Sequence, residues 1–110
     1  MTKGFGNLMR QAQQLQAKML KVQDEMATRT AEASAGGGMV TALANGKQEL
    51  ISIKVEKEVI NPDDTEMLED LVVAAVNKAL DESQKMAQEE MSKATAGMLP
   101  NIPGLNLPGM

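Results

Sequence analysis

Apolar residues recur at alternating spacings of three and four positions along the first 26 of the 110 residues. At the pitch of an α-helix, this spacing places such residues on one narrow stripe. The stripe consists of Leu8, Ala12, Leu15, Met19, Val22 and Met26. We therefore predict a helix over residues 4–27 that buries this stripe against a partner helix, which either the same chain or a second copy must supply.

Basic residues occupy the other side of the same predicted helix. Lys3, Arg10 and Lys21 fall nearly opposite the stripe at about 100° per residue, and Lys18 lies toward the flank of that side. One surface of the helix can therefore assemble while another offers positive charge. A helix with two such faces indicates a binding protein.

The middle of the chain changes to the two-residue period that is typical of β-strands. We predict three strands, at residues 30–34, 39–44 and 48–55. Three glycines at 36–38 supply the first loop, because glycine tolerates positive φ. Asn45 and Gly46 predict a type I′ hairpin turn. The apolar face of this antiparallel meander comprises Val40, Ala42, Ala44, Ile51, Ile53 and Val55.

A second long helix is predicted to follow the sheet and to run to about Thr95. Asp63 and Glu66 form a D-x-x-E start that resembles a capping box, and Gly97 stops the helix. Its first half is apolar over a wide arc and is expected to lie on the sheet. Its second half is mostly polar, and a helix of roughly 30 residues spans about 45 Å. We therefore expect the second half to project from the body.

Composition suggests one small domain that a second copy completes. Phe5 is the one aromatic residue, and the ten Met specify packing poorly, so a single copy would have a marginal core. We expect residues 1–97 to form the domain. Residues 98–110 contain three of the four Pro and are expected to form a flexible tail rich in Pro, Gly and Met.

Enzymatic chemistry finds little support in the sequence. The chain has no Cys and no His, which removes thiolate chemistry, the serine triad and the commonest zinc ligand. Adjacent acids such as Glu89 and Glu90 point in different directions on a helix and form no acid–base pair. We expect no catalytic residue, metal site, cofactor or small-molecule substrate. No apolar run approaches a membrane span or a signal peptide, so we expect a cytoplasmic protein without a membrane partner.

Charge is unevenly distributed along the chain and leaves two functions open. Residues 1–30 carry five basic and two acidic residues, a net +3, whereas residues 61–95 carry three basic and nine acidic residues, a net −6. The basic first helix favours duplex DNA gripped through its phosphates, because the chain has only Phe5 on which a single-stranded base could stack. Little sequence preference is expected, because only one Arg besides Arg29 is present to read guanine. The acidic balance favours the alternative, a dimeric protein-interaction module with incidental DNA affinity.

Three separated segments resemble the YbaB/EbfC family of bacterial nucleoid-associated proteins. They are residues 6–25, Asn45-Gly46, and residues 66–72 with the sequence EMLEDLV. Phe5 and its neighbouring glycines, together with the Met/Pro/Gly-rich tail, are also similar to the family. The resemblance covers nearly the whole chain.

The resemblance implies an α+β fold in the order helix, three strands, helix, and an intertwined homodimer with long projecting helices. It also implies DNA binding on the nucleoid with an influence on gene expression. On the first helix the matching basic positions are Arg10, Lys18 and Lys21, beside Lys3. On the last helix Lys85 matches, and Lys78 and Lys93 are further candidates for DNA contact. We expect the dimer interface to include Leu8, Leu15, Met19, Val22 and Met26.

Overall fold

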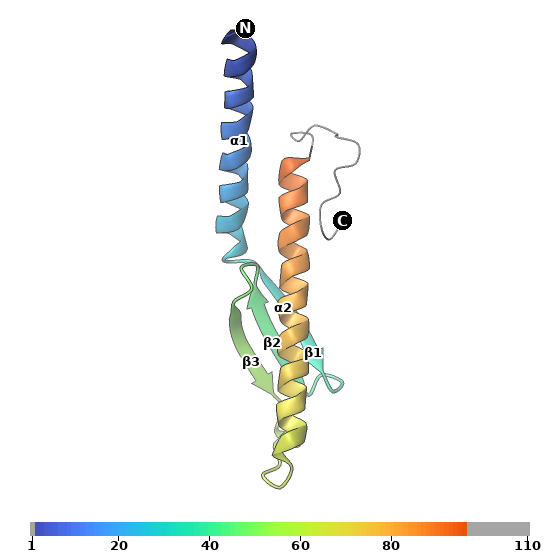
Figure 1. Cartoon of the computed structure of the whole chain (residues 1–110). Helices are drawn as coiled ribbons and strands as arrows, with labels where there is room; N and C mark the ends of the chain where they lie inside the picture. The colour runs from blue at the N-terminus through green and yellow to red at the C-terminus, as the bar shows by residue number, and fades with distance from the viewer. Residues whose placement is uncertain (1, 97–110) are drawn as a thin grey trace, which may run out of the picture.

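The chain forms a long helix, then a three-stranded sheet, then a second long helix, which confirms the predicted α+β order (Figure 1). The computed structural model describes residues 2–96, with side chains from residue 4. The elements are α1 (Thr2–Met26), β1 (Thr30–Ala35), β2 (Val40–Asn45), β3 (Leu50–Val55), the 3₁₀ turn η1 (Lys57–Val59) and α2 (Thr65–Thr95). The predicted stop at Gly97 and the predicted tail at 98–110 lie outside the described residues.

The sheet is an antiparallel meander with strand order β1-β2-β3. Ala35 pairs with Val40 across the first hairpin, and Val40 pairs with Val55 across the second. An irregularity near Ala44 shifts the register, so that Ala44 pairs with Leu50. The three predicted strands are confirmed, but the third begins at Leu50 because Gln48 adopts a positive φ of 60° in the turn.

The prediction of a type I′ turn at Asn45-Gly46 is wrong. Such a turn needs positive φ at both central residues, and neither Asn45 nor Gly46 has it. Instead, the N–H of Gln48 donates to the carbonyl oxygen of Asn45 at 3.0 Å, and Gln48 supplies the left-handed residue. Asn45 is buried at the end of β2, so its side chain serves tertiary contacts and its backbone stays extended.

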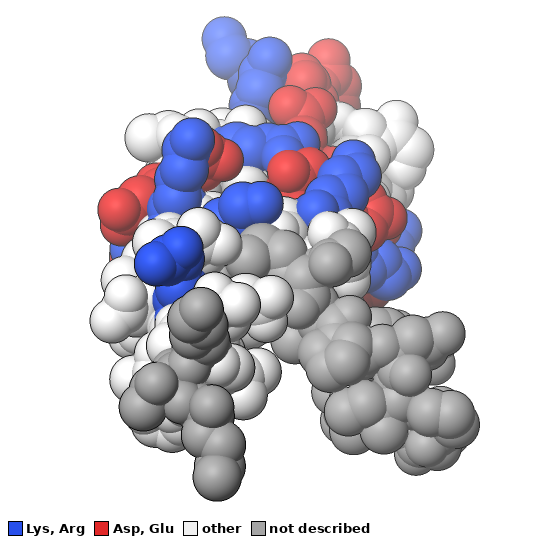
Figure 2. Space-filling model, turned by 90° about the horizontal axis from the view of Figure 1, so that it is seen from above, with Lys and Arg blue, Asp and Glu red and all other residues white. Residues whose placement is uncertain are grey.

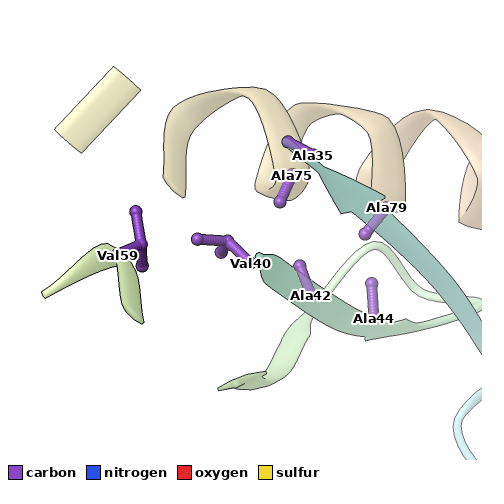
Figure 3. Packing of buried hydrophobic residues seen from close by; sticks show 7 residues of the cluster. All are labelled: Ala35, Val40, Ala42, Ala44, Val59, Ala75 and Ala79. Carbon is purple, nitrogen blue, oxygen red and sulfur yellow. The ribbon is translucent and has the colours of Figure 1, made fainter. Parts of the chain in front are cut away.

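The core lies between the sheet and the first half of α2, as predicted. α2 crosses β1 and β2, and its small side chains Ala75 and Ala79 point at the strands (Figure 3). Alanines on both surfaces let the helix lie close to the sheet. Val59 of η1 closes one end of this core beside Val40. The fully described core cluster is Ala35, Val40, Ala42, Ala44, Val59, Ala75 and Ala79.

The start of α2 differs from the predicted capping residue by one position. Asp64, and not Asp63, is the N-cap, and its Oδ1 accepts a hydrogen bond from the N–H of Met67 at 3.3 Å. The N–H of Asp63 donates to Oδ1 of Asn61 at 3.0 Å, which places Asp63 inside the preceding turn. The D-x-x-E spacing therefore located the helix start correctly within one residue.

The projecting element is mainly α1. The second half of α2 does extend past the sheet, but it runs beside the C-terminal half of α1 (Figure 1). The N-terminal half of α1 continues beyond the end of α2 as an arm. Over the described residues, neither long helix contains a stretch apolar enough to cross a lipid bilayer.

Candidate nucleic-acid interface

The base of α1 is fixed to the β2–β3 turn by Asn45. Its Nδ2 donates to the carbonyl oxygen of Ala27 at 3.2 Å and to Oε1 of Glu49 at 2.8 Å. Its Oδ1 accepts from the N–H groups of Lys47 at 2.9 Å and Glu49 at 3.0 Å. Every polar atom of this buried side chain therefore has a hydrogen-bond partner. These hydrogen bonds fix the C-terminal end of α1 against the sheet.

The predicted apolar stripe of α1 is divided between two environments. Val22 and Met26, near the base, are buried, with 8% and 3% of their surface exposed. Val22, Met26 and Met91 of α2 line the same hollow, so α2 of the same chain supplies a partner for this part of the stripe. Farther along the arm, Leu15 is half-buried, whereas Met19 and Leu8 are 37% and 65% exposed.

Basic side chains from both helices meet in a groove near the end of α2. Lys18 and Lys21 of α1 and Lys93 of α2 line this groove, which has a volume of about 360 Å³ and which we call the basic groove. Glu25 and Glu90 also line it. Seen from above, the described residues show blue Lys and Arg side chains interspersed with red acids across the ends of the helices (Figure 2).

An ion pair joins the connection between α1 and β1 to α2 beside the basic groove. Nη1 of Arg29 lies 2.7 Å from Oε1 of Glu90, and Nζ of Lys93 lies 3.7 Å from the same oxygen. The hydrogen bond from Arg29 is the main cause that holds the pKa of Glu90 below its ordinary value. Arg29 was absent from the predicted site, because its nearness to Glu90 depends on how α2 returns along α1.

The other predicted basic residues lie outside the basic groove. Nζ of Lys78 donates to the carbonyl oxygen of Ser34 in β1 at 3.4 Å. Lys85 is engaged by acids of its own helix, with Nζ 3.4 Å from Oδ2 of Asp81 and 3.9 Å from Oε1 of Glu82.

Arg10 extends the basic side of α1 beyond the groove. It is exposed and lies on nearly the same side of the helix as Lys21, because 11 residues make about three turns. The Lys3 side chain lies outside the described part of the chain. The predicted basic residues of α1 whose side chains are described therefore lie along one side of the helix, from the basic groove toward the N-terminus.

A second exposed apolar surface lies on β3, and no pattern in the sequence predicted it. Leu50 and Ile53 of β3 are 43% and 40% exposed, although their partners Ala44 and Ala42 are buried. α2 covers β1 and β2 and leaves β3 largely open (Figure 1). Leu50 and Ile53 together are called the β3 surface below.

Comparisons with known proteins agree with this architecture. The family model described as the YbaB/EbfC DNA-binding family matches residues 1–98. A nucleoid-associated protein of Syntrophobacter fumaroxidans is 54% identical over 110 residues, with 100% of this chain and 97% of the relative covered. A nucleoid-associated protein of Thermodesulfovibrio yellowstonii is 53% identical over 103 residues, covering 94% of this chain and 89% of the relative.

A solved structure shares the fold at low sequence identity. The crystal structure of an uncharacterized protein from Helicobacter pylori superposes with a TM-score of 0.56 and 20% identity, covering 76% of this chain and 93% of the other. That similarity concerns the fold alone. The match to residues 1–98 and the two relatives above half identity establish more, namely that this chain belongs to the YbaB/EbfC DNA-binding family.

Proposed function

We propose that this chain is a nucleoid-associated protein that grips duplex DNA through its phosphates at the basic groove. The observation that carries the proposal is that Lys18, Lys21 and Lys93 converge from two helices on one groove. Membership of a DNA-binding family supports it. The protein would act on the nucleoid, in the cytoplasm, and influence gene expression by occupying DNA.

The side chains of the groove favour contact with the backbone over reading of bases. Lysine ammonium groups act as point charges toward phosphate and carry little geometric selectivity. The groove contains no aromatic side chain on which a base can stack, and Phe5 is the chain's one aromatic residue. Arg10, and Lys3 beyond it in the sequence, would continue the contact along the arm. Lys78 and Lys85, which are engaged elsewhere, would contribute less.

We also infer that the protein works as a homodimer. The remaining part of the α1 stripe, with Leu8, Leu15 and Met19, and the β3 surface both present apolar side chains to solvent. Val22 and Met26, which are also predicted for the interface, are already buried within one chain. A second copy that covers the open surfaces would double the number of basic grooves, and with it the number of phosphates that one assembly contacts.

A salt titration with matched variants tests DNA binding at the groove. The ligand is a labelled duplex of random sequence, and the proteins are wild type, a K18Q/K21Q/K93Q variant and a K47Q/K54Q/K57Q control of equal charge. Because each neutralised phosphate contributes about 0.9 to the slope of log Kobs against log salt, the groove variant should lose up to about three units of slope per protomer, and the control should lose little.

Two results would contradict the proposal in different ways. Equal losses in the groove variant and the control would mean that binding follows net charge and has no site at the groove. No binding by wild type at low salt would favour the alternative of a protein-interaction module. That alternative is supported by Phe5 and Leu20, which are 68% and 54% exposed on α1.

A further inference from the structure

One carboxylate oxygen of Glu90, in the basic groove, lies between two cationic side chains. Oε1 of Glu90 receives Nη1 of Arg29 at 2.7 Å and faces Nζ of Lys93 at 3.7 Å. A guanidinium and an ammonium directed at one anionic oxygen make the donor set that also binds a phosphodiester oxygen. Glu90 therefore sits where a DNA phosphate would find two cations.

The ion pair lies near the surface, so the cations can change partners. The Arg29 side chain is 47% exposed, the Lys93 side chain 73% and the Glu90 side chain 26%. Exposed ion pairs are stabilised only weakly, because water solvates the separated charges well. Neither Arg29 nor Lys93 belongs to the apolar core, so both can turn toward a ligand while the sheet and α2 stay packed.

Two glutamates partly offset the positive charge of the three lysines that line the basic groove. Lys18, Lys21 and Lys93 line it together with Glu25 and Glu90. Among the described residues, Glu90 is paired with Arg29 and Lys93, whereas Glu25 lines the same groove without a salt bridge from its side chain. The two glutamates therefore carry the same charge at one site, but Glu90 alone of the two holds cations that DNA could use.

We propose that Glu90 is a resident anion that a DNA phosphate displaces, and that Arg29 and Lys93 are phosphate contacts which Glu90 holds in the free protein. This inference rests on the proposed binding of DNA at the basic groove. It adds Arg29 to the contact residues and assigns Glu90 the role of weakening binding. The phosphate takes over the guanidinium, and the released Glu90 carboxylate is hydrated and recruits a counterion from solution.

The exchange has a measurable signature in affinity and in salt dependence. Replacing Glu90 by Gln removes a negative charge that repels the incoming phosphate and frees Arg29, which should raise affinity about three- to tenfold at low salt. In the E90Q variant no displaced carboxylate takes up a counterion. Nothing then offsets the counterions that DNA releases when the protein binds. The salt slope of the E90Q variant should therefore be steeper than that of wild type by up to about one unit.

The test compares E90Q with E25Q, each in the wild-type background and in an R29Q background. Both changes remove one negative charge from the groove, but E25Q leaves the Arg29–Glu90 pair intact. We expect E90Q to raise affinity for the random-sequence duplex more than E25Q does. In the R29Q background, the gain from E90Q should fall toward the gain from E25Q, with the remainder due to the release of Lys93. Equal gains in the wild-type background, or an undiminished E90Q gain without Arg29, would overturn the proposal.

Further measurements keep the inference separate from the proposed function and from misfolding. If the K18Q/K21Q/K93Q variant binds DNA as well as wild type does, the groove itself is wrong and the proposed function fails. If that variant is impaired but E90Q equals E25Q, displacement alone fails. Helix content of E90Q should match that of E25Q, and an NMR signal from Nε–H of Arg29 in wild type should shift when duplex is added. An unchanged Arg29 signal at saturating duplex would contradict the exchange.

Discussion

The N–H of Gly46 donates a 2.8 Å hydrogen bond to the carbonyl oxygen of Met26, which joins the β2–β3 turn directly to the last residue of α1. A Cβ atom at position 46 would lie 2.7 Å from both Cβ and Sδ of Met26 and 3.0 Å from its carbonyl oxygen. The two segments meet at a distance that only glycine permits. Gly46 thus sets the position of α1 relative to the sheet.

We expect G46A to destabilise the protein by about 1–3 kcal/mol, as is usual when a group is forced into a packed contact. The measurement is the free energy of unfolding from urea titration followed by circular dichroism. G6A is the matched control, because no heavy atom lies within 4 Å of a Cβ built there. A helical Gly-to-Ala change at an open site should stabilise by up to about 1 kcal/mol. Equal stability of both variants would contradict the close contact.

Asn45 offers a prediction about polar satisfaction at the same junction. N45A removes the partners of buried groups and should cost about 1–3 kcal/mol. N45D should cost more at pH 7, because it replaces the donor to Ala27 and Glu49 by a carboxylate that faces a carbonyl oxygen and another carboxylate.

The cost of N45D should depend on pH. The new carboxyl has a raised pKa in the folded state, so acidification should narrow its deficit relative to wild type, and urea titrations at pH 7 and pH 5 would show this. An N45D deficit that stays constant or grows toward pH 5 would contradict the assigned hydrogen bonds.

Acid should loosen the contact that Arg29, between α1 and β1, makes with α2. The pKa of Glu90 is lowered in the folded protein, chiefly by the hydrogen bond from Arg29. Its contribution to stability is therefore present above the ordinary Glu value of about 4.3 and is lost as pH falls through the lower folded value. We expect the NMR signal of the Arg29 guanidinium to change in that acidic window in wild type. E90Q should show no such transition, and a transition of equal size in E90Q would assign it to another group.

The homodimer is tested by charges placed on the two open apolar surfaces. L15D/M19D and L50D/I53D should each shift the protein toward monomer, since burying an unpaired carboxylate costs several kcal/mol. Sedimentation velocity measures the mass, and circular dichroism checks that each variant is folded. An M9Q variant, which removes a half-exposed methionine away from the stripe, should keep the wild-type mass. A monomeric wild type at micromolar concentration, or dimers in both double variants, would contradict the proposed interface.

The local patterns in the sequence predicted the elements well, and the contacts between elements were beyond their reach. The extents of α1 and α2 follow from periodicity and polarity over many residues, so errors stayed within two residues. The turn at Asn45 was misassigned because its geometry is decided by the tertiary contacts of Asn45 and Gly46. Periodicity also marked Val22 and Met26 as seam residues, but it could not say that α2 of the same chain covers them.

The candidate site shows the same division. Lys18 and Lys21 were identifiable as neighbours on one helical face, since only the helical period was needed. Their meeting with Lys93, and the pairing of Arg29 with Glu90, depend on α2 returning beside α1, which no spacing within either helix encodes.

The most direct test of the account is an NMR titration of the isotope-labelled full chain with a short random-sequence duplex at low salt. We predict the largest shift changes at residues 18–25 and 90–96, on the two helices that line the basic groove. Little change should occur at Lys54 and Ser52 on the polar face of β3. Changes confined to the sheet, with residues 18–25 and 90–96 unaffected at saturation, would contradict the proposal that DNA binds between α1 and α2.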